Sequence, residues 1–349
     1  MNIRVAKCLA IVVASSAIMA GCGGSNGSSD ASTGTLRLGL TDGPIDGADH
    51  VWIQFDGLEL KRAGDGPPES YAFDPAACSD EFPDPETCTI DLLALQGIKQ
   101  TTILAEDVPV GDYEWIRVMV NAERNTLDSF IEYPDRQCPL WIPSGDQTGL
   151  KLKGGIEVTA DGAAYILDLD LNKSILHPPG LAGPPTDDLE ACVENYLLKP
   201  VIRIVEEDEA GSIAGVIDES LLYEDDVLVD GCRDVDPEDG VVDSLKVYVF
   251  EDFDSAAVAD DYDGEGDPVS SAVAEYDMDS MTYSYEVGFL LNGDYLLGLS
   301  CTGDVDLQEE DNFGCNFEDP GCVETEPPFG FIAEQVVTAI EGETVDGSF

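Results

Sequence analysis

The stretch TLRLGLTDGPIDGADHVWIQFDGLEL, residues 35–60, contains two β-strand patterns separated by a turn. In its first part leucine alternates with arginine or glycine, at Leu36, Leu38 and Leu40, which is the period-2 pattern of a half-buried strand. The dipeptides Asp42-Gly43 and Asp46-Gly47 then punctuate a turn. These signals predict a hairpin that opens a β-sandwich.

The second strand of this stretch changes its apolar phase partway along. Val51, Ile53 and Phe55 share one face, but after Asp56-Gly57 the apolar positions become Leu58 and Leu60. A one-residue shift at a glycine indicates a β-bulge, in which an extra residue is inserted into the strand.

Further strand patterns continue to the end of the chain, and no window shows a sustained helical period. The alternating segments lie near residues 89–95, 101–105, 113–121, 129–133, 150–158, 164–171, 196–205, 211–217, 245–249, 282–287, 293–299 and, as a terminal hairpin, 335–344. The fold class expected is all-β, with two consecutive β-sandwich domains of immunoglobulin-like or prealbumin-like type.

The charge of the chain is strongly and unevenly acidic. Its 349 residues, enough for about two domains, include 72 acidic and 16 basic residues, and the net charge is −56. From Glu206 onward 41 acidic residues accompany only Arg233 and Lys246, a local charge of −39. This change marks a domain boundary, with one domain at 35–205 and an acidic one at 206–349. Nucleic acid is excluded as a partner, and the charge suits a salt-rich medium or cation binding.

The N-terminus has the features of an export signal. Arg4 and Lys7 precede an apolar run too short to span a bilayer, so residues 1–21 are expected to be a signal peptide. The run ends in Met19-Ala20-Gly21-Cys22, which resembles the lipobox of bacterial lipoproteins and implies that Cys22 carries lipid. An ordinary signal peptide with an unrelated cysteine is the alternative.

Residues 22–34 are rich in Gly and Ser and are expected to form a flexible tether with a reach of roughly 20 Å. Gly23, rather than Asp, follows the lipobox cysteine, and in the lipoprotein sorting scheme this implies delivery to the outer membrane. Several acyl chains would hold the protein there stably.

Eight of the ten cysteines remain after Cys8 and Cys22 are set aside, an even number that favours disulfides in an exported protein. They divide four and four at the domain boundary. Short acidic loops favour the pairs Cys78–Cys88 and Cys315–Cys322, which leaves Cys138–Cys192 and Cys232–Cys301. The chain has no Cys-x-x-Cys pair and only two His, so a zinc site is disfavoured.

One acidic loop has the alternating carboxylates that a calcium ion uses. Calcium takes six to eight oxygen ligands on a tightly turned loop, and Asp239-Gly240 would provide the turn. The expected calcium ligands are Asp234, Asp236, Glu238, Asp239 and Asp243. The alternative is a solvated acidic loop.

Two tryptophans are candidates for a ligand platform. Trp52 and Trp115 fall on strand faces opposite the apolar stripes, and exposed aromatic residues can mark a binding surface. The alternative, which is favoured, is that a second sheet or the neighbouring domain covers them. A catalytic constellation is not evident, because no Gly-x-Ser-x-Gly elbow is present and paired carboxylates are uninformative in so acidic a chain.

Four segments together resemble the domain-of-unknown-function 4382 family of bacterial envelope proteins. They are LTDGPIDGADHVWIQFDGLEL, IDLLALQG (90–97), VPVGDYEWIRVMVNA (108–122) and LDLDLNKSIL with YLLKPVIRIV (167–176 and 196–205). The resemblance covers residues 35–205 and implies a fold and an envelope setting without an activity.

The second half resembles prealbumin-like, carboxypeptidase-regulatory-like sandwiches, which have a carbohydrate-binding-like fold and are appended to surface proteins. The motifs that carry this resemblance are G-x-I-x-G-V-I at 211–217, V-Y-V-F at 247–250 and N-G-D-Y at 292–295.

The function expected is therefore non-catalytic. The chain would be an outer-membrane lipoprotein that acts as a surface or periplasmic binding or adhesion module, with a polysaccharide or another envelope protein as its ligand. A structural envelope component without a small ligand, and an enzyme acting on envelope polymers, are the alternatives.

Overall fold

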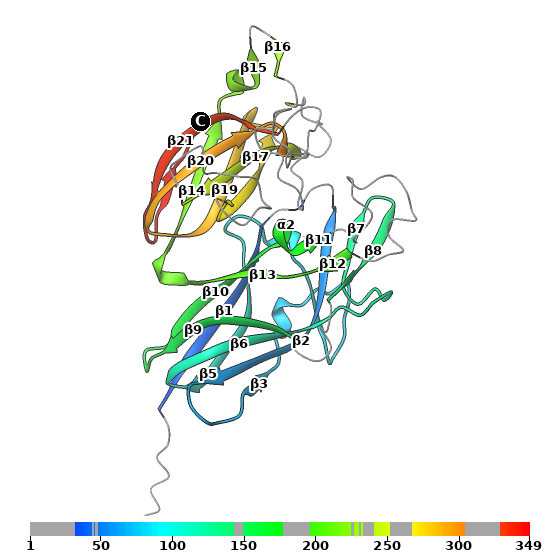
Figure 1. Ribbon diagram of the computed structural model, residues 1–349, viewed down its shortest axis with the longest axis vertical. Coiled ribbons are helices and arrows are strands. Elements are labelled where there is room, and N and C mark those ends of the chain that lie inside the picture. Colours follow the sequence, from blue (N-terminus) through cyan, green and yellow to red (C-terminus); the bar gives the residue numbers. More distant parts are fainter. Residues whose placement is uncertain are drawn as a thin grey trace, which may run out of the picture. The chain divides into compact units, whose positions relative to one another are not determined.

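The computed structural model describes residues 32–43, 45, 48–142, 149–176, 196–224, 227–229, 232, 241–251, 267–303 and 329–349 (Figure 1). Ser32–Phe349 forms one compact unit. The described part is all-β, as expected, and its one α-helix, α2 (Leu171–Ser174), is a single turn.

Two sheets enclose the core of the first half. One has the order β13-β10-β1-β5, and the other has the order β11-β12-β8-β7-β2-β6-β9, with β3 and β4 also paired to β2. The core between them contains Leu36, Leu38 and Leu40 from the smaller sheet and Ile116, Val118 and Val120 from the larger one. The strands are β1 (Thr33–Asp42), β2 (His50–Arg62), β3 (Glu69–Tyr71), β4 (Cys88–Asp91), β5 (Thr101–Pro109), β6 (Gly111–Asn121), β7 (Phe130–Tyr133), β8 (Arg136–Trp141), β9 (Leu150–Val158), β10 (Ala163–Asp170), β11 (Ile175–Leu176), β12 (Tyr196–Leu198) and β13 (Val201–Glu206).

The predicted opening hairpin is wrong, because its two strands lie in different sheets. β1 pairs with β10 in parallel and with β5 in antiparallel orientation, whereas β2 pairs with β6 and β7. Each sheet of a sandwich buries one of its faces, so its strands alternate whichever strands they pair with. The alternation predicted for these two strands is therefore correct even though their pairing is wrong.

The predicted bulge in β2 is confirmed. The register with β6 shifts between Phe55 and Gly57, and Gly57 has φ +133°, a conformation that favours glycine. A Cβ at Gly57 would stand 2.5 Å from the carbonyl oxygen of Tyr71 on β3. The bulge therefore keeps both Phe55 and Leu58 in the core while β3 approaches closely.

Several strand boundaries differ from those predicted. Residues 89–95 divide into β4 and a 3-10 helix, Leu93–Leu95, and residues 196–205 divide into β12 and β13, which belong to different sheets. Pro200 lies between β12 and β13, and its missing N–H interrupts a ladder. β1 begins at Thr33, so the last two residues of the predicted tether are paired with β5.

The second half forms one seven-stranded sheet rather than a sandwich of two sheets. Its order is β21-β20-β17-β18-β19-β14-β22, and its two end strands contact each other. Gln335 on β21 also donates to the carbonyl oxygens of Gly347 and Ser348, which follow β22, at 2.7 and 3.2 Å. The strands are β14 (Ala210–Ile217), β17 (Val241–Phe250), β18 (Ser270–Asp277), β19 (Thr282–Leu291), β20 (Gly293–Ser300), β21 (Phe331–Ala339) and β22 (Thr344–Asp346), and a separate ribbon pairs β15 (Tyr223–Glu224) with β16 (Val227–Leu228).

This sheet is nearly closed because register shifts let it curl. Shifts occur between Gly211 and Ile213 on β14 and between Leu299 and Ser300 on β20, and each bulge bends its strand. The expected terminal hairpin is accordingly wrong, since β21 pairs with β20 while β22 pairs with β14. A barrel and a sandwich bury the same alternate residues, so strand alternation cannot distinguish them.

A 3-10 helix, Glu207–Glu209, joins β13 to β14, and the strands on its two sides share no sheet. Phe289 of β19 nevertheless packs on Ile166, Val205 and Ala210. Its φ of +55° is unusual for a bulky residue. Phe289 of the second half thus buries Ile166 of β10 and Val205 of β13.

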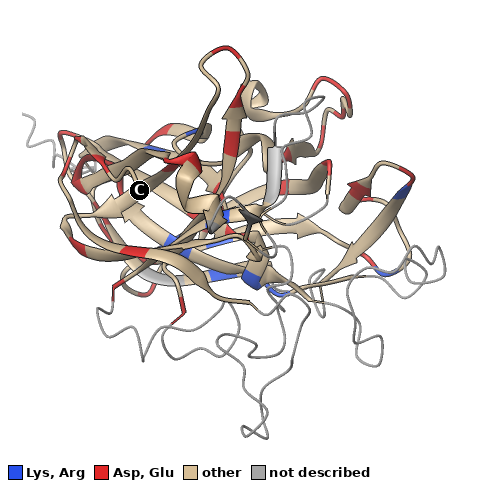
Figure 2. Ribbon diagram, turned by 90° about the horizontal axis from the view of Figure 1, so that it is seen from above, with Lys and Arg blue, Asp and Glu red and all other residues tan. Residues whose placement is uncertain are grey.

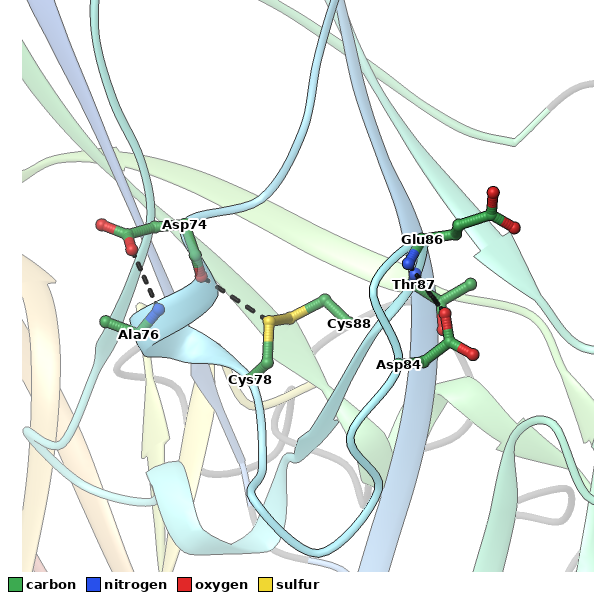
Figure 3. Close-up of a disulfide and its surroundings, with 7 residues drawn as sticks. All are labelled: Asp74, Ala76, Cys78, Asp84, Glu86, Thr87 and Cys88. Carbon is green, nitrogen blue, oxygen red and sulfur yellow. Dashed lines mark hydrogen bonds between the residues drawn. A yellow bond between two sulfur atoms is a disulfide. The ribbon is translucent and has the colours of Figure 1, made fainter.

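Two of the favoured disulfides are formed, Cys78–Cys88 and Cys232–Cys301. Figure 3 shows the first, beside the loop in which the Asp84 carboxylate accepts the backbone N–H groups of Glu86 and Thr87 at 2.8 and 3.1 Å. Cys138 is also disulfide-bonded. Cys192, Cys315 and Cys322 lie outside the described residues.

Candidate functional site

The predicted calcium loop and the lipidation site fall largely outside the described residues. This applies to Cys22 and to Asp234, Asp236, Glu238 and Asp239, and for Asp243 only the backbone of β17 is described. Within the described ranges, no group of three or more His, Cys, Asp or Glu side chains is arranged to hold a metal ion. In the same ranges, no helix has the length and apolarity needed to cross a membrane.

Trp52 is not part of an exposed platform, in line with the favoured alternative that this residue is covered. Its side chain is only 4% exposed, and the Phe82 ring covers it edge-on with a centroid distance of 4.8 Å. Its indole N–H donates to Glu132 at 3.0 Å. The loop closed by Cys78–Cys88 provides Phe82, so a loop rather than a second sheet buries this tryptophan.

His50 at the start of β2 is part of the same packing. Its Nδ1 lies 2.7 Å from Asp91 Oδ2, and its ring lies 5.3 Å from Trp52. Burial alone would lower the pKa of His50, but the hydrogen bond to Asp91 and the charge of this carboxylate outweigh it, and the pKa is raised. The hydrogen bond between His50 and Asp91 therefore holds the start of β2 in place.

Trp115 is partly exposed on the outward face of the larger sheet. On β6 the residues Ile116, Val118 and Val120 are buried, while Trp115 and Arg117 alternate with them on the other face. Two cations lie against the indole: Arg117 Cζ is 4.6 Å and Lys151 Nζ is 4.5 Å from the ring centroid. Such contacts are attractive because the ring faces carry negative potential.

Strand register places further basic residues around Trp115. Across β2, β6 and β9, one row is Glu59, Arg117 and Lys151, and the next row is Lys61, Trp115 and Lys153. We call these six residues the Trp115 face. Four of the six are basic, in a chain with 16 basic residues among 349, so the face departs strongly from the acidic background.

Only part of this positive charge is neutralised within the face. Arg117 donates to Glu59 at 2.8 Å, but its Nε is buried without a hydrogen-bond partner. Lys61 donates to the carbonyl oxygens of Arg62 and Gly64, both at 2.6 Å. Lys151 is exposed. Figure 2 shows how few Lys and Arg segments the ribbon has beside its many Asp and Glu segments.

A second unusual feature is a buried carboxyl group at the carboxyl ends of the parallel strands β1 and β10. Asp42 is 4% exposed, and neither of its oxygens has a hydrogen-bond partner. Burial raises the pKa of Asp42 well above its usual range, and the charges of Asp168 and Asp170 raise it further, against a smaller opposing effect of the Gly43 and Leu171 N–H groups.

The two neighbouring carboxylates are already engaged by cations. Arg203 donates to Asp168 at 2.5 and 3.2 Å, and Lys173 Nζ lies 3.5 Å from Asp170. These pairs compensate the two neighbours but leave Asp42 without a partner of its own. The negative charge of Asp42, when the group is ionised, therefore lowers the stability of the fold, and the residue does not form a ligand site.

A groove of about 540 Å³ lies between the loop 96–99 and the outer face of β14, β18 and β19. Its lining includes Lys99, Glu275, Glu286 and Asp346. Burial raises the pKa of Glu286. The aromatic residue in its lining, Tyr285, is buried, and the lining lacks the excess of cations that characterises the Trp115 face.

Sequence reasoning identified Trp115 but not its charged surroundings. The bases at positions 61, 117, 151 and 153 belong to three strands that are not adjacent in the chain. The alternation of Lys151 and Lys153 with apolar residues in LKLKGGIEV was an available signal, because it places both lysines opposite the core side of one strand.

Comparison with known proteins identifies one domain. Residues 33–200 match the family model described as "Domain of unknown function (DUF4382)", so this part of the chain is similar to DUF4382 domains. No curated protein sequence matches the chain.

Solved structures similar to the chain include a leucine-rich repeat protein from Bacteroides thetaiotaomicron, the TIE protein of Bacillus anthracis and the minor pilin GBS52 of Streptococcus agalactiae. The identities are 10%, 8% and 10%, and the TM-scores are 0.20, 0.16 and 0.17. The alignments cover 91%, 91% and 90% of this chain but 26%, 33% and 94% of the other chains. The chain thus spans about a quarter and a third of the first two, and TM-scores this low do not establish a shared fold.

Proposed function

We propose that this chain is a non-catalytic, lipid-anchored module of the bacterial outer membrane that binds polysaccharide at the Trp115 face. The observation that carries the proposal is the partly exposed indole of Trp115 on an outward sheet face, flanked by cations from neighbouring strands. An aromatic ring offers a large rigid apolar surface, which suits the apolar C–H face of a sugar. The sequence resemblances in both halves, to envelope and surface-protein domains, support the same setting.

Replacing Trp115 by alanine is expected to weaken polysaccharide binding by about tenfold to thirtyfold, the effect of removing a central aromatic contact from a binding surface. The measurement is isothermal titration of the full chain with a panel of soluble polysaccharides. Trp141→Ala is the matched control, since Trp141 is also partly exposed and has Arg124 Cζ 5.0 Å from its ring centroid, but lies on β8. Equal loss in both variants would refute a site at Trp115.

The lipid anchor is tested separately with Cys22→Ser. The wild-type chain expressed in a bacterial host is expected to partition into the detergent phase, because several acyl chains bind a membrane firmly, and the variant into the aqueous phase. If both forms remain aqueous and the mature N-terminus lies elsewhere, the lipoprotein assignment fails while the binding assignment stands.

A binding module for another envelope protein is the second candidate. The observation that favours it is the groove along β14, β18 and β19, whose volume of about 540 Å³ is within the range of ligand sites. Glu286→Gln, which changes a carboxylate in this groove, is expected to leave polysaccharide binding unchanged.

A further inference from the structure

We propose that the Trp115 face selects anionic polysaccharides, with a carboxylate or sulfate of the sugar bound between Arg117 and Lys151. This inference rests on the proposed function and names its ligand class. It is carried by two observations at the face: a like-charged pair and an aromatic ring.

Arg117 and Lys151 are directly opposite each other on β6 and β9. Like charges in this arrangement destabilise a sheet. Because each group lies within 4.6 Å of the same ring centroid, the two cations are at most about 9 Å apart, a range in which exposed charges still interact. A single anion placed between them would convert this repulsion into two attractive contacts.

Arg117 is held in place by Glu59, whose carboxylate accepts a hydrogen bond from Nη1 at 2.8 Å. Its Nε is buried and therefore out of reach of a ligand from solvent. The side chain is nevertheless 25% exposed, so its charge can act on a carboxylate or sulfate bound beside Lys151.

Trp115 adds an apolar surface that an anion attached to a sugar ring can use. Lys61 stands opposite Trp115 on β2, but its Nζ is engaged by the carbonyl oxygens of Arg62 and Gly64 and lies 4.0 Å from Glu114. A glycan that carries a carboxylate or sulfate can therefore contact both the indole and the Arg117–Lys151 pair, whereas free phosphate or sulfate would use only the pair.

β9 is an edge strand of its sheet, and lysines on an edge discourage pairing with another chain. If the lysines of β9 serve only to protect this edge, the face needs no ligand. The acidic surface of a second copy of the chain is another occupant that charge would favour, given the net charge of −56. The charge-neutral variant Lys151→Gln distinguishes the three. It is expected to weaken glycan binding under the proposal, to cause aggregation if the lysine protects the edge, and to dissociate a dimer if a second copy binds.

The test titrates the full chain with alginate, which is carboxylated, with dextran sulfate and with neutral dextran. The wild type is expected to bind both anionic polymers more tightly than dextran, and Lys151→Gln to weaken anionic binding about fivefold, as expected for one lost charge-assisted contact. Lys199→Gln removes the same charge from an exposed lysine between β12 and β13, away from the Trp115 face and the groove, and is expected to leave binding of all three polymers unchanged. Tighter binding of alginate would identify the bound group as a carboxylate, and tighter binding of dextran sulfate would identify it as a sulfate.

Several outcomes would overturn the inference. Dextran binding as tight as alginate binding, lost in Trp115→Ala but kept in Lys151→Gln, would leave the polysaccharide function intact and remove the anionic selectivity. Binding to none of the three polymers would refute both. Sedimentation that shows a dimer dissociated by Lys151→Gln, without glycan binding, would assign the face to a second copy instead, and aggregation of Lys151→Gln alone would assign the lysine to edge protection.

Discussion

Replacing Cys232 and Cys301 together by alanine is expected to lower the free energy of unfolding by about 4 kcal/mol, the larger of the two disulfide effects we expect. The bridge joins residues 69 positions apart. In the chain-entropy model, a disulfide stabilises by restricting the unfolded chain, and the effect grows with the length of the closed loop.

The position of this bridge adds a local reason for a large effect. Cys232 and Cys301 are 4% and 1% exposed and belong to the core of the seven-stranded sheet. Cys301 directly follows β20, and Cys232 lies between β16 and β17. The bridge therefore ties the chain ahead of β17 to the end of β20, the strand that pairs with β17.

The matched control is the double replacement of Cys78 and Cys88, whose separation is 10 residues and whose loss is expected to cost about 3 kcal/mol in the same model. Urea unfolding monitored by circular dichroism gives both values. A smaller cost for the long loop than for the short one would contradict the entropic explanation. Reducing agent should lower the wild-type midpoint and have less effect on either double variant.

The Asp42→Asn variant is expected to gain stability relative to the wild type as the pH rises from 4 to 7. Its cause is the buried Asp42 carboxyl, which lacks hydrogen-bond partners and lies near the charges of Asp168 and Asp170. Leaving a charged group buried without partners costs about 1–3 kcal/mol or more, and asparagine has nearly the same shape without the charge.

The sign of this effect follows from the direction of the pKa shift. The pKa of Asp42 is raised by folding, so the folded state binds the proton more tightly than the unfolded chain, where an aspartate has a pKa of about 3.9. The contribution to stability is fully present below the unfolded pKa and is lost as the pH rises toward and through the folded pKa. The difference between variant and wild type should therefore be smallest near pH 4 and largest near neutrality.

Asp112→Asn serves as the control, because Asp112 is an exposed aspartate on β6. Thermal unfolding of the three proteins at several pH values tests the prediction. A pH-independent difference for Asp42→Asn, or an equal trend in Asp112→Asn, would show that the buried carboxyl does not carry the effect.

The Trp115 face shows how far a local pattern can go. The alternation in β6 correctly separated Trp115 and Arg117 from the buried residues, because side chains of a strand point alternately to opposite faces. The same rule placed Trp52 opposite the apolar stripe of β2, yet Trp52 is buried. The loop that carries Phe82 covers it, and the position of a loop held by a disulfide depends on contacts far apart in the sequence.

The sequence by itself determined the properties that each segment carries locally: the strand character, the bulge at Gly57, and the acidic balance of the chain. These follow from side-chain periodicity, backbone freedom and net charge, which need no knowledge of a partner. The short disulfide loop at Cys78 and Cys88 was equally accessible, since its ends are close along the chain.

The tertiary structure alone decided which strands pair. It placed β1 beside β10 and β5 instead of β2, and it curled the second half into one nearly closed sheet. Pairing depends on long-range register and on bulges, because alternate residues are buried equally well in a hairpin, a sandwich or a barrel. The buried Asp42 and the basic rows around Trp115 arise only from that pairing, since parallel strands bring Asp42 to Asp168 and three antiparallel strands bring Lys61 and Lys153 to Trp115.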